Sequence, residues 1–301
     1  MSAHLILIDA LNLIRRIYAV QERPFNHTNS ADGDDLSDST KKQVLFNTQK
    51  ACATALSKII AEHQPTHGLA VFDSHKPCWR YQLFDGYKQG RKKMPQHLAL
   101  KLNDIQDAFM EQGIDSLISE EDEADDLIAT LAIKMAFHGK KVTIISTDKG
   151  FLSLSSPNIV LYDHFNRRYL DEAHIKEKFA VKPSQLVDLW TLTGDTTNKI
   201  PGVPGIGQVT ASQLLNQYGS IKALLDATDL KPAIKDKLDA NKDTIKLAKQ
   251  LLTLKQDIPL GFNLKALRLT SPDLQHSDNI VPISNDVMNG QAFSNNQLSN
   301  K

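Results

Sequence analysis

The sequence predicts an α/β protein: a parallel sheet over roughly residues 1–165, followed by a helical region that begins near residue 171. Through the first half, short apolar runs alternate with segments of helical periodicity, an order that is typical of parallel sheets. After that point helical periodicity dominates. The length of 301 residues is enough for one large domain or two smaller ones, and a hydrophobic fraction of 41% supports a core.

The alternation can be followed along the chain. Strands are expected at 4–8, 67–73, 114–118, 141–147 and 159–163, and helices at 10–20, 43–63, about 96–112 and from Glu123 to about 137. Further helical segments are expected at 185–193, 208–217, 220–226 and 242–254; Lys182-Pro183-Ser184 before the first is a helix start. The polar stretch 26–41 is predicted to be a solvated loop or a disordered insertion, and the tail 271–301 to be disordered.

Composition excludes several classes of protein. Lys plus Arg and Asp plus Glu both total 35, so any affinity for DNA must come from local basic patches. Cys52 and Cys78 form neither a metal-binding spacing nor a disulfide framework, which suits a reducing compartment. Without eighteen consecutive apolar residues or a basic N-terminal region, neither a membrane span nor a signal peptide is expected. We therefore expect a cytoplasmic protein, and a monomer.

Carboxylates follow the predicted strands. Asp9 and Asp73 end two of them, Asp148 follows a third, and Glu123-Ala-Asp-Asp126 opens a helix. Because the carboxyl ends of parallel strands meet at one edge of a sheet, we expect these acids to gather there and to repel unless a cation lies between them. Hard oxygen ligands suit Mg²⁺ or Mn²⁺. The predicted metal-binding set is Asp9, Asp73, Glu123, Asp125, Asp126, Asp148 and Asp195.

Each of these acids also has an ordinary interpretation. Acids at a helix N-terminus are common because the helix dipole favours them, and Asp148 or Asp195 alone could be a strand-end or turn residue. Within the set, Asp125 is the preferred direct ligand, since Glu123 and Asp126 beside it could hold the waters of the metal. Two such ions roughly 3.5–4 Å apart can activate water and stabilise a leaving oxygen in phosphodiester hydrolysis.

A glycine-rich turn, Gly202-Val-Pro-Gly-Ile-Gly207, precedes a predicted helix that contains Thr210-Ala211. This pattern indicates a helix-hairpin-helix, whose unpaired backbone N–H groups can bind a DNA phosphate without reading sequence. The alternative is an ordinary tight turn. Carbonyls of such a turn can also hold a monovalent cation. The predicted DNA-binding residues are Gly205, Ile206, Gly207, Gln208, Val209 and Thr210.

A basic and aromatic stretch over 76–93 follows the strand that ends at Asp73. Basic side chains bind phosphates and aromatic ones can stack on unpaired bases, whereas the alternative is a solvated surface loop. The residues concerned are Lys76, Trp79, Arg80, Tyr81, Tyr87, Lys88, Arg91, Lys92 and Lys93.

Taken together, these motifs resemble the 5′-nuclease superfamily, which includes the 5′-nuclease domains of bacterial polymerase I and the flap endonucleases. The resemblance covers about residues 4–265 and is greatest to short, stand-alone bacterial flap endonucleases. It is carried by Asp9-Ala-Leu-Asn12, Val71-Phe-Asp73, Gly86-Tyr-Lys-Gln-Gly-Arg91, Glu123-Ala-Asp-Asp126, Ser146-Thr-Asp-Lys149, Thr193-Gly-Asp195 and Pro201-Gly-Val-Pro-Gly-Ile-Gly207.

The resemblance implies a PIN-like nuclease core over 1–170, a helical arch over 74–95 and a DNA-binding helix-hairpin-helix region over 171–265. It also implies Mg²⁺-dependent cleavage of DNA at 5′ flaps or single-strand/duplex junctions, in replication and repair. Lys88 and Arg91 would act on the scissile phosphate, although either could instead form a salt bridge to the acids. The K⁺ ligands it implies are the carbonyls of Leu192, Thr193, Pro201, Val203 and Ile206.

Two positions depart from the family pattern. Gly150 and Asn198 stand where the family has aspartates of its second metal site. We therefore predict one firmly bound Mg²⁺ and a second that is weak, water-mediated or recruited by the substrate. The alternative is a structure-specific DNA-binding protein with weak or lost nuclease activity. A PIN-like ribonuclease would share the acids but would not explain the turn at 202–207.

Overall fold

A six-stranded sheet forms the centre of the first half of the chain. The computed structural model describes residues 3–25, 36–74, 76–119 and 121–269. The strands β1 (His4–Asp9), β2 (His67–Phe72), β3 (Asp115–Ile118), β4 (Lys141–Ile145) and β5 (Ile159–Asp163) are parallel, and β6 (Arg168–Leu170) pairs antiparallel with β5. The order is β3-β2-β1-β4-β5-β6, so the predicted parallel α/β core is confirmed and β6 is an addition.

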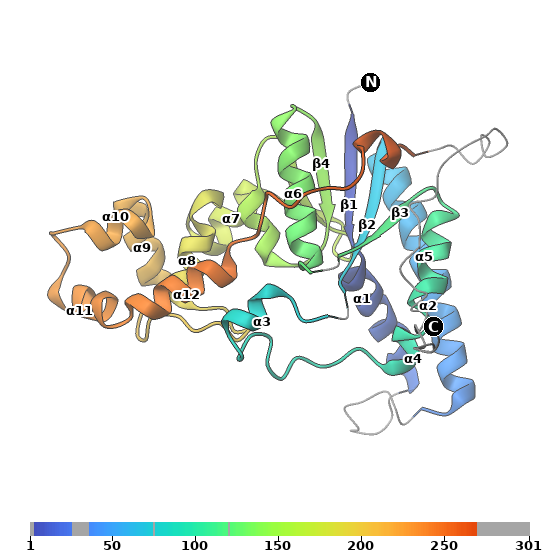
Figure 1. Cartoon of the computed structure of the whole chain (residues 1–301), viewed down its shortest axis with the longest axis horizontal. Coiled ribbons are helices and arrows are strands. Elements are labelled where there is room, and N and C mark those ends of the chain that lie inside the picture. Colours follow the sequence, from blue (N-terminus) through green and yellow to red (C-terminus); the bar gives the residue numbers. More distant parts are fainter. Residues whose placement is uncertain (1–2, 26–35, 75, 120, 270–301) are drawn as a thin grey trace, which may run out of the picture. The chain divides into compact units, whose positions relative to one another are not determined.

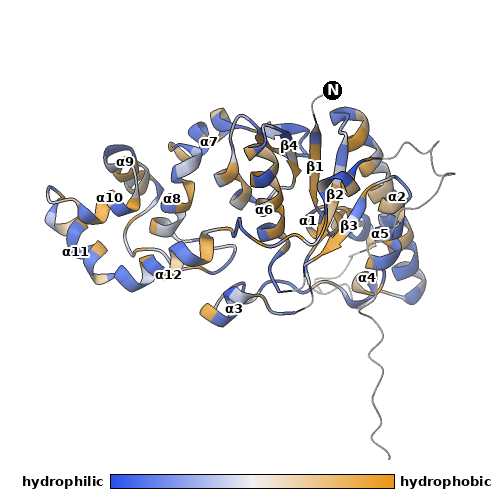
Figure 2. Cartoon of the chain, turned by 45° about the horizontal axis from the view of Figure 1, so that its top comes forward, coloured by the Kyte–Doolittle hydropathy of each residue, from blue (hydrophilic) through white to orange (hydrophobic). Residues whose placement is uncertain are grey.

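Side chains of the central strand alternate between two apolar layers, as a period of two requires. Leu5 and Leu7 pack in the cluster of α6 (Ala124–Phe137), whereas Ile6 and Ile8 pack in the cluster of α1 (Ala10–Glu22), α2 (Asp38–His63) and α5 (Leu102–Met110). Figure 1 shows α6 on one side of the strands and α2 and α5 on the other. β1 is covered on both faces, and Figure 2 colours it apolar.

Two predicted boundaries in the first half are wrong. The described end of the polar stretch 26–41 is helical, because Ser37 caps α2 by accepting a hydrogen bond from the amide of Thr40 at 3.2 Å. The predicted helix 96–112 is two helices, α4 (Gln96–Ala99) and α5. Between them the amide of Lys101 bonds to the carbonyl of Leu98, which tightens the turn. Residues 26–35 and the predicted tail 271–301 lie outside the described residues.

The second half is helical, as predicted. It contains α7 (Glu172–Phe179), α8 (Leu186–Thr193), α9 (Gln208–Tyr218), α10 (Ile221–Asp226), α11 (Pro232–Ala240) and α12 (Lys242–Leu252). The prediction missed α11, although Pro232 at its first position is a helix-start signal. None of the helices in the described ranges is long and apolar enough to cross a membrane.

Both halves contribute to a single apolar cluster. Leu7 and Ile144 of the sheet share it with Leu189 of α8 and Leu215 of α9, and the described residues form one compact unit. The domain boundary predicted between 170 and 171 stays a prediction.

Candidate active site and nucleic-acid interface

Four aspartates lie at the carboxyl edge of the sheet. Asp9 ends β1 and caps α1, Asp73 follows β2, Asp148 follows β4 and caps a 3₁₀ turn, and Asp125 lies in the first turn of α6. The strand order reverses between β1 and β4, and such a switch point is where open α/β sheets bind ligands. Asp9 and Asp148 stand on either side of it.

These four carboxylates repel one another. Burial, together with the charges of Asp148 and Asp73, raises the pKa of Asp9 to about 7. Burial and the charges of Asp148, Asp9 and Asp73 raise the pKa of Asp125 well above its usual value, and only partial relief comes from Lys88. No described residue donates a hydrogen bond to the carboxylate of Asp125. The cluster therefore has excess negative charge that a cation would neutralise.

The donor chemistry of the cluster fits a hard divalent cation such as Mg²⁺, which prefers carboxylate oxygens. Part of that donor capacity is engaged within the protein. One oxygen of Asp73 accepts the amide of Ala124 at 2.7 Å, and one oxygen of Asp9 accepts the hydroxyl of Ser146 at 2.8 Å. In the described ranges no group of three or more His, Cys, Asp and Glu side chains is arranged to hold a metal ion as it stands. Coordination would thus require side-chain rotation.

Glu123 and Asp126 face cations instead. The buried guanidinium of Arg80, only 1% exposed, donates to Glu123 at 2.6 Å and to both oxygens of Asp126 at 2.7 Å. Asp126 also accepts the indole N–H of Trp79 at 3.1 Å and the amide of Lys255 at 2.9 Å. These bonds occupy Asp126 fully, so in this arrangement it holds Arg80 and has no lone pair left for a metal ion or its waters.

Arg80 also joins distant parts of the chain. Its Nε donates to the carbonyl of Leu251 at 2.8 Å and an Nη donates to that of Thr253 at 3.2 Å. The guanidinium stacks on the ring of Trp79 at 4.3 Å. Arg80 thereby connects the segment that contains α3 (Trp79–Leu83) to the end of α12 and to α6. The expectation that Arg80 binds phosphate does not fit its burial. Nothing in the sequence predicted that Arg80 would instead pair with Glu123, which lies far from it along the chain.

Lys88 forms the salt bridge that the sequence left open as an alternative. Its Nζ lies 2.5 Å from Glu123, whose other oxygen accepts the hydroxyl of Tyr87 at 2.9 Å. Although burial alone would raise it, Lys88 and Arg80 hold the pKa of Glu123 below its usual value. The backbone N–H of Lys88 bonds to the carbonyl of Asn198 at 2.9 Å, and its φ is 53°. Glu123 thus holds the ammonium of Lys88 and Asn198 holds its backbone, and the charge of Lys88 acts on Asp125.

The remaining side chains of the basic and aromatic stretch differ in their exposure. Tyr87 is buried and cannot stack on a base as it stands, whereas Tyr81 is 39% exposed. Arg91, Lys92 and Lys93 are exposed, so their charges can meet a phosphate.

Asp195 has different partners from the four aspartates. It is 2% exposed, pairs with Nζ of Lys149 at 2.9 Å, and accepts the amide nitrogen of the Asn198 side chain at 2.7 Å. Lys149 also lies 5.3 Å from the ring of Trp190. The structure therefore gives Asp195 a protein cation as its partner. Lys149 is the last residue of the Ser146-Thr-Asp-Lys149 motif, but no pattern in the sequence predicted its pairing with Asp195.

The turn at 202–207 leads directly into α9. A Cβ at Gly202 would lie 2.3 Å from the backbone nitrogen of Gly194, so the turn closes tightly on the end of α8. Gly205 has a φ of 75°. Gly207 caps α9 without a side-chain bond, and Val209 in its first turn is 71% exposed. The first backbone N–H groups of α9 therefore point to an open surface.

The carbonyls predicted to bind K⁺ are partly engaged. That of Leu192 accepts the amide of Val203 at 2.8 Å, and that of Val203 accepts the amide of Ile206 at 3.0 Å. A carbonyl oxygen has a second lone pair, so these bonds leave coordination possible. The predicted carbonyl set, which also includes Thr193 and Pro201, stays a prediction.

Comparison with known proteins identifies two matching family models. One, described as the N-terminal resolvase-like domain of 5′-3′ exonucleases, matches residues 4–180. The other, described as the C-terminal SAM fold of 5′-3′ exonucleases, matches residues 181–275. Together they cover the sheet and the helical region.

Curated relatives match over nearly their whole length. Flap endonuclease Xni of Colwellia psychrerythraea (strain 34H) is 72% identical over 279 residues, which are 93% of this chain and 96% of the relative. Flap endonuclease Xni of Vibrio parahaemolyticus is 46% identical over 275 residues, which are 91% of this chain and 99% of the relative.

Solved structures share the fold at low sequence identity. T5 5′-exonuclease with bound zinc has a TM-score of 0.64 at 21% identity, covering 83% of this chain and 89% of the other. A bacteriophage T5 flap endonuclease, in a pseudo-enzyme-product complex with DNA and metal ions, has a TM-score of 0.63 at 22% identity with the same coverage.

Proposed function

This chain belongs to the 5′-3′ exonuclease family, and on that premise we propose that it is a structure-specific flap endonuclease. It would hydrolyse phosphodiester bonds in DNA near the base of 5′ flaps, with Mg²⁺. The resemblance deduced from the sequence motifs is thereby confirmed at the level of the family. The proposal extends to action as a monomer in the cytoplasm during replication and repair.

The observation that carries the proposal is the uncompensated cluster of Asp9, Asp73, Asp125 and Asp148 at the switch point of the sheet. Its acids are the residues that would hold Mg²⁺, with Asp125 as the most direct ligand because no described residue donates to its carboxylate. When bound, the cation would supply charge neutralisation and an activated water.

Lys88 is a protein cation whose charge acts on Asp125 of this cluster. Because Glu123 and the carbonyl of Asn198 hold it, its ammonium is already oriented beside Asp125 and can neutralise a scissile phosphate without reorganisation. Arg91, which is exposed, would contact the same phosphate from solvent.

The second cation is proposed to be weak or indirect. The oxygens of Asp195 are engaged by Lys149, by the side chain of Asn198 and by the amide of Thr197. Gly150 contributes no ligand. The same engagement of Asp195 favours the second candidate function, a structure-specific DNA-binding protein with weak or lost nuclease activity.

A cleavage assay separates the two functions. A labelled 5′-flap DNA is incubated with Mg²⁺ and with wild-type protein or Asp125→Ala. We expect cleavage by the wild type and a loss of about 10³-fold in rate for the variant, the scale of removing a key electrostatic group. Binding of the flap without cleavage by either protein would favour the second function, and equal cleavage by both would remove Asp125 from the site. An RNA flap in parallel tests the ribonuclease alternative.

We propose that the first turn of α9 grips duplex DNA, with K⁺ on the carbonyls of the preceding turn. Val209→Glu tests this more cleanly than a change at Gly205, where a Cβ would lie 2.6 Å from Nζ of Lys237. Because Val209 is exposed, the new carboxylate meets a phosphate and not the core.

We expect Val209→Glu to weaken binding at every duplex sequence and to lower the slope of log affinity against log salt by about 1. Val20→Glu, at an exposed position on α1, is the matched control. An unchanged slope for Val209→Glu would refute the phosphate contact. Titration of K⁺ against Na⁺ with the wild-type protein tests the cation.

A further inference from the structure

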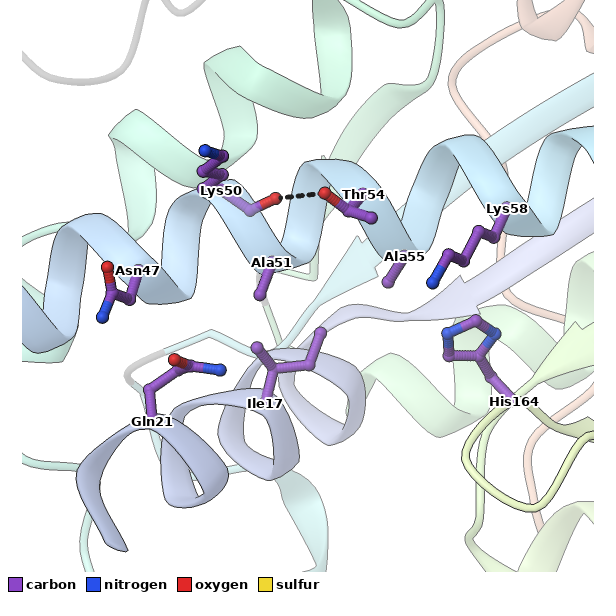
Figure 3. A pocket seen from close by; sticks show the side chains of 9 residues that line it. All are labelled: Ile17, Gln21, Asn47, Lys50, Ala51, Thr54, Ala55, Lys58 and His164. Carbon is purple, nitrogen blue, oxygen red and sulfur yellow. Dashed lines mark hydrogen bonds between the residues drawn. The ribbon is translucent and has the colours of Figure 1, made fainter. Parts of the chain in front are cut away.

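A groove of about 470 Å³ runs between α1 and α2, away from the residues assigned above. Its volume lies within the range of roughly 300–1,000 Å³ that is typical of ligand sites. Figure 3 shows Ile17 of α1 facing Ala51 and Ala55 of α2, which form an apolar floor. His164, which follows β5, closes one end. The two helices leave this gap because small alanine side chains face α1.

The rim of the groove is polar and basic. Lys58 extends toward His164 in Figure 3, while Lys50 extends along the outer side of α2. Both lysines are exposed. The ammonium of Lys58 is directed toward the groove, whereas the long stem of Lys50 must rotate to bring its ammonium to the same anion. Gln21 and Asn47 add amides at the other end, which can both donate and accept hydrogen bonds.

Acids near the groove are already engaged. Glu62 accepts the hydroxyl of Tyr162 at 2.5 Å, and Asp163 accepts the side chain of Asn166 at 2.6 Å. Nδ1 of His164 is buried without a hydrogen-bond partner among the described residues. The lining itself contains two lysines and no acid, so its charge is positive, although the charges of Glu62 and Asp163 also reach His164. One imidazole nitrogen of His164 remains to be satisfied.

A continuous chain of contacts joins the groove to the acid cluster. The hydroxyl of Ser146 donates to Asp9, and the next residue, Thr147, accepts a bond from Arg16 at 2.9 Å. The guanidinium of Arg16 lies 4.5 Å from the ring of Phe165, the neighbour of His164. His164 lines both the groove and a narrow recess beside Ser146 and Thr147.

We propose that this groove binds an unpaired DNA strand that extends from the acid cluster across Arg16. Phosphates lie against Lys58 and Lys50, sugars and bases pack on the floor, and the amides of Gln21 and Asn47 contact base edges. An unpaired strand fits better than a duplex, because its unstacked bases can lie on the apolar floor and its Watson–Crick edges, which pairing occupies in a duplex, are open to these amides. The identity of the ligand rests on the proposed DNA-processing function.

Fluorescence anisotropy in the presence of EDTA measures this binding without cleavage. The probes are an unpaired oligonucleotide of roughly 8 nucleotides, inside the usual site sizes of about 4–16, and a blunt duplex. The variants are Lys50→Gln, Lys58→Gln and the double substitution. Lys42→Gln is the matched control, since Lys42 is exposed on the same helix but does not line the groove.

For the unpaired probe we expect each groove variant to lower the salt slope by about 0.7 and the double variant by about 1.4, since each removes one phosphate contact. The double variant should also bind about tenfold more weakly. Lys42→Gln should behave as wild type, and the blunt duplex should be affected by none of them. Ala51→Leu should weaken the unpaired probe without changing the slope, because it fills the floor without altering charge.

Three results would overturn the proposal: no loss with the groove variants, an equal loss with Lys42→Gln, or an equal loss for the blunt duplex. Because binding is measured without divalent metal, a chain that fails to cut flaps can still pass this test. Failure of the groove and failure of the nuclease function are thus distinguishable.

Discussion

Asp125 and its neighbours Glu123 and Asp126 share one helical turn but have opposite surroundings. Burial and the charges of three other aspartates raise the pKa of Asp125, whereas Lys88 and Arg80 hold the pKa of Glu123 down. Glu123 and Asp126 are three residues apart and so lie on one side of the helix, while Asp125 points elsewhere. A run of acids in a sequence can therefore combine an unsatisfied, functional carboxylate with fully satisfied, structural ones.

The largest expected effect tests Asp126, whose carboxylate is fully hydrogen-bonded. Asp126→Ala leaves the guanidinium of Arg80 buried with much of its partner removed, and breaking a buried ion pair typically costs about 3–5 kcal/mol. We expect a loss of that size in the free energy of urea unfolding. Arg80→Met combined with Asp126→Leu should recover much of it, because no buried charge then lacks its partner. A loss below about 1 kcal/mol in the single variant would contradict a stabilising role for the Arg80–Asp126 ion pair.

The second prediction tests Asp125, whose carboxylate accepts no hydrogen bond from a described residue. Burial and repulsion raise the pKa of Asp125, so at neutral pH the folded state binds this proton more tightly than the unfolded state does and the ionised carboxylate destabilises the fold. Asp125→Asn should therefore increase stability at neutral pH, the opposite sign to Asp126→Ala. Mg²⁺ at about 100 times its dissociation constant should stabilise the wild type by about 2.7 kcal/mol. Thermal unfolding with and without Mg²⁺ should show a much smaller gain for Asp125→Asn. An equal gain in both proteins would place the cation elsewhere.

The smallest expected effect concerns Asp195, which pairs with Lys149 but belongs to the metal-binding set predicted from the sequence. Asn198→Asp replaces an amide donor 2.7 Å from Asp195 with a second carboxylate. We expect a loss of about 1 kcal/mol without divalent cations, the net scale of one lost hydrogen bond, and a smaller loss with Mg²⁺. Asn198→Ala, which removes the bond without adding charge, is the control. If Mg²⁺ leaves the difference between the two variants unchanged, no cation is recruited to this position.

Gly150→Asp combined with Asn198→Asp tests by activity whether a second cation can be bound near Asp195. If a weak second cation limits the rate, the double variant should cut flap DNA faster than wild type at low Mg²⁺. The added side chain at Gly150 must tolerate a contact of 3.2 Å with Asp148, so folding is checked by thermal unfolding first.

Local patterns were enough for much of the fold. The apolar run before Asp9 and the helical periodicity after Asp125 each predicted an element that the structure contains. The failures came where short-range signals were weak or overlooked: the cap at Ser37, the break at Lys101, and α11 after Lys231. The three-residue strand β6 exists because it pairs with β5, a contact that no local pattern encodes.

The candidate site shows the same division. The sequence by itself determined that acids end the strands and open α6, that a glycine turn precedes α9, and which family the motifs match. Only the tertiary structure decided which acids meet a cation. Arg80 lies 43 residues before Glu123 in sequence, and Asp195 lies 46 residues after Lys149, yet both pairs are in contact. Burial and charge act through space, so the partner of each carboxylate depends on how the helices pack and not on its neighbours in the chain.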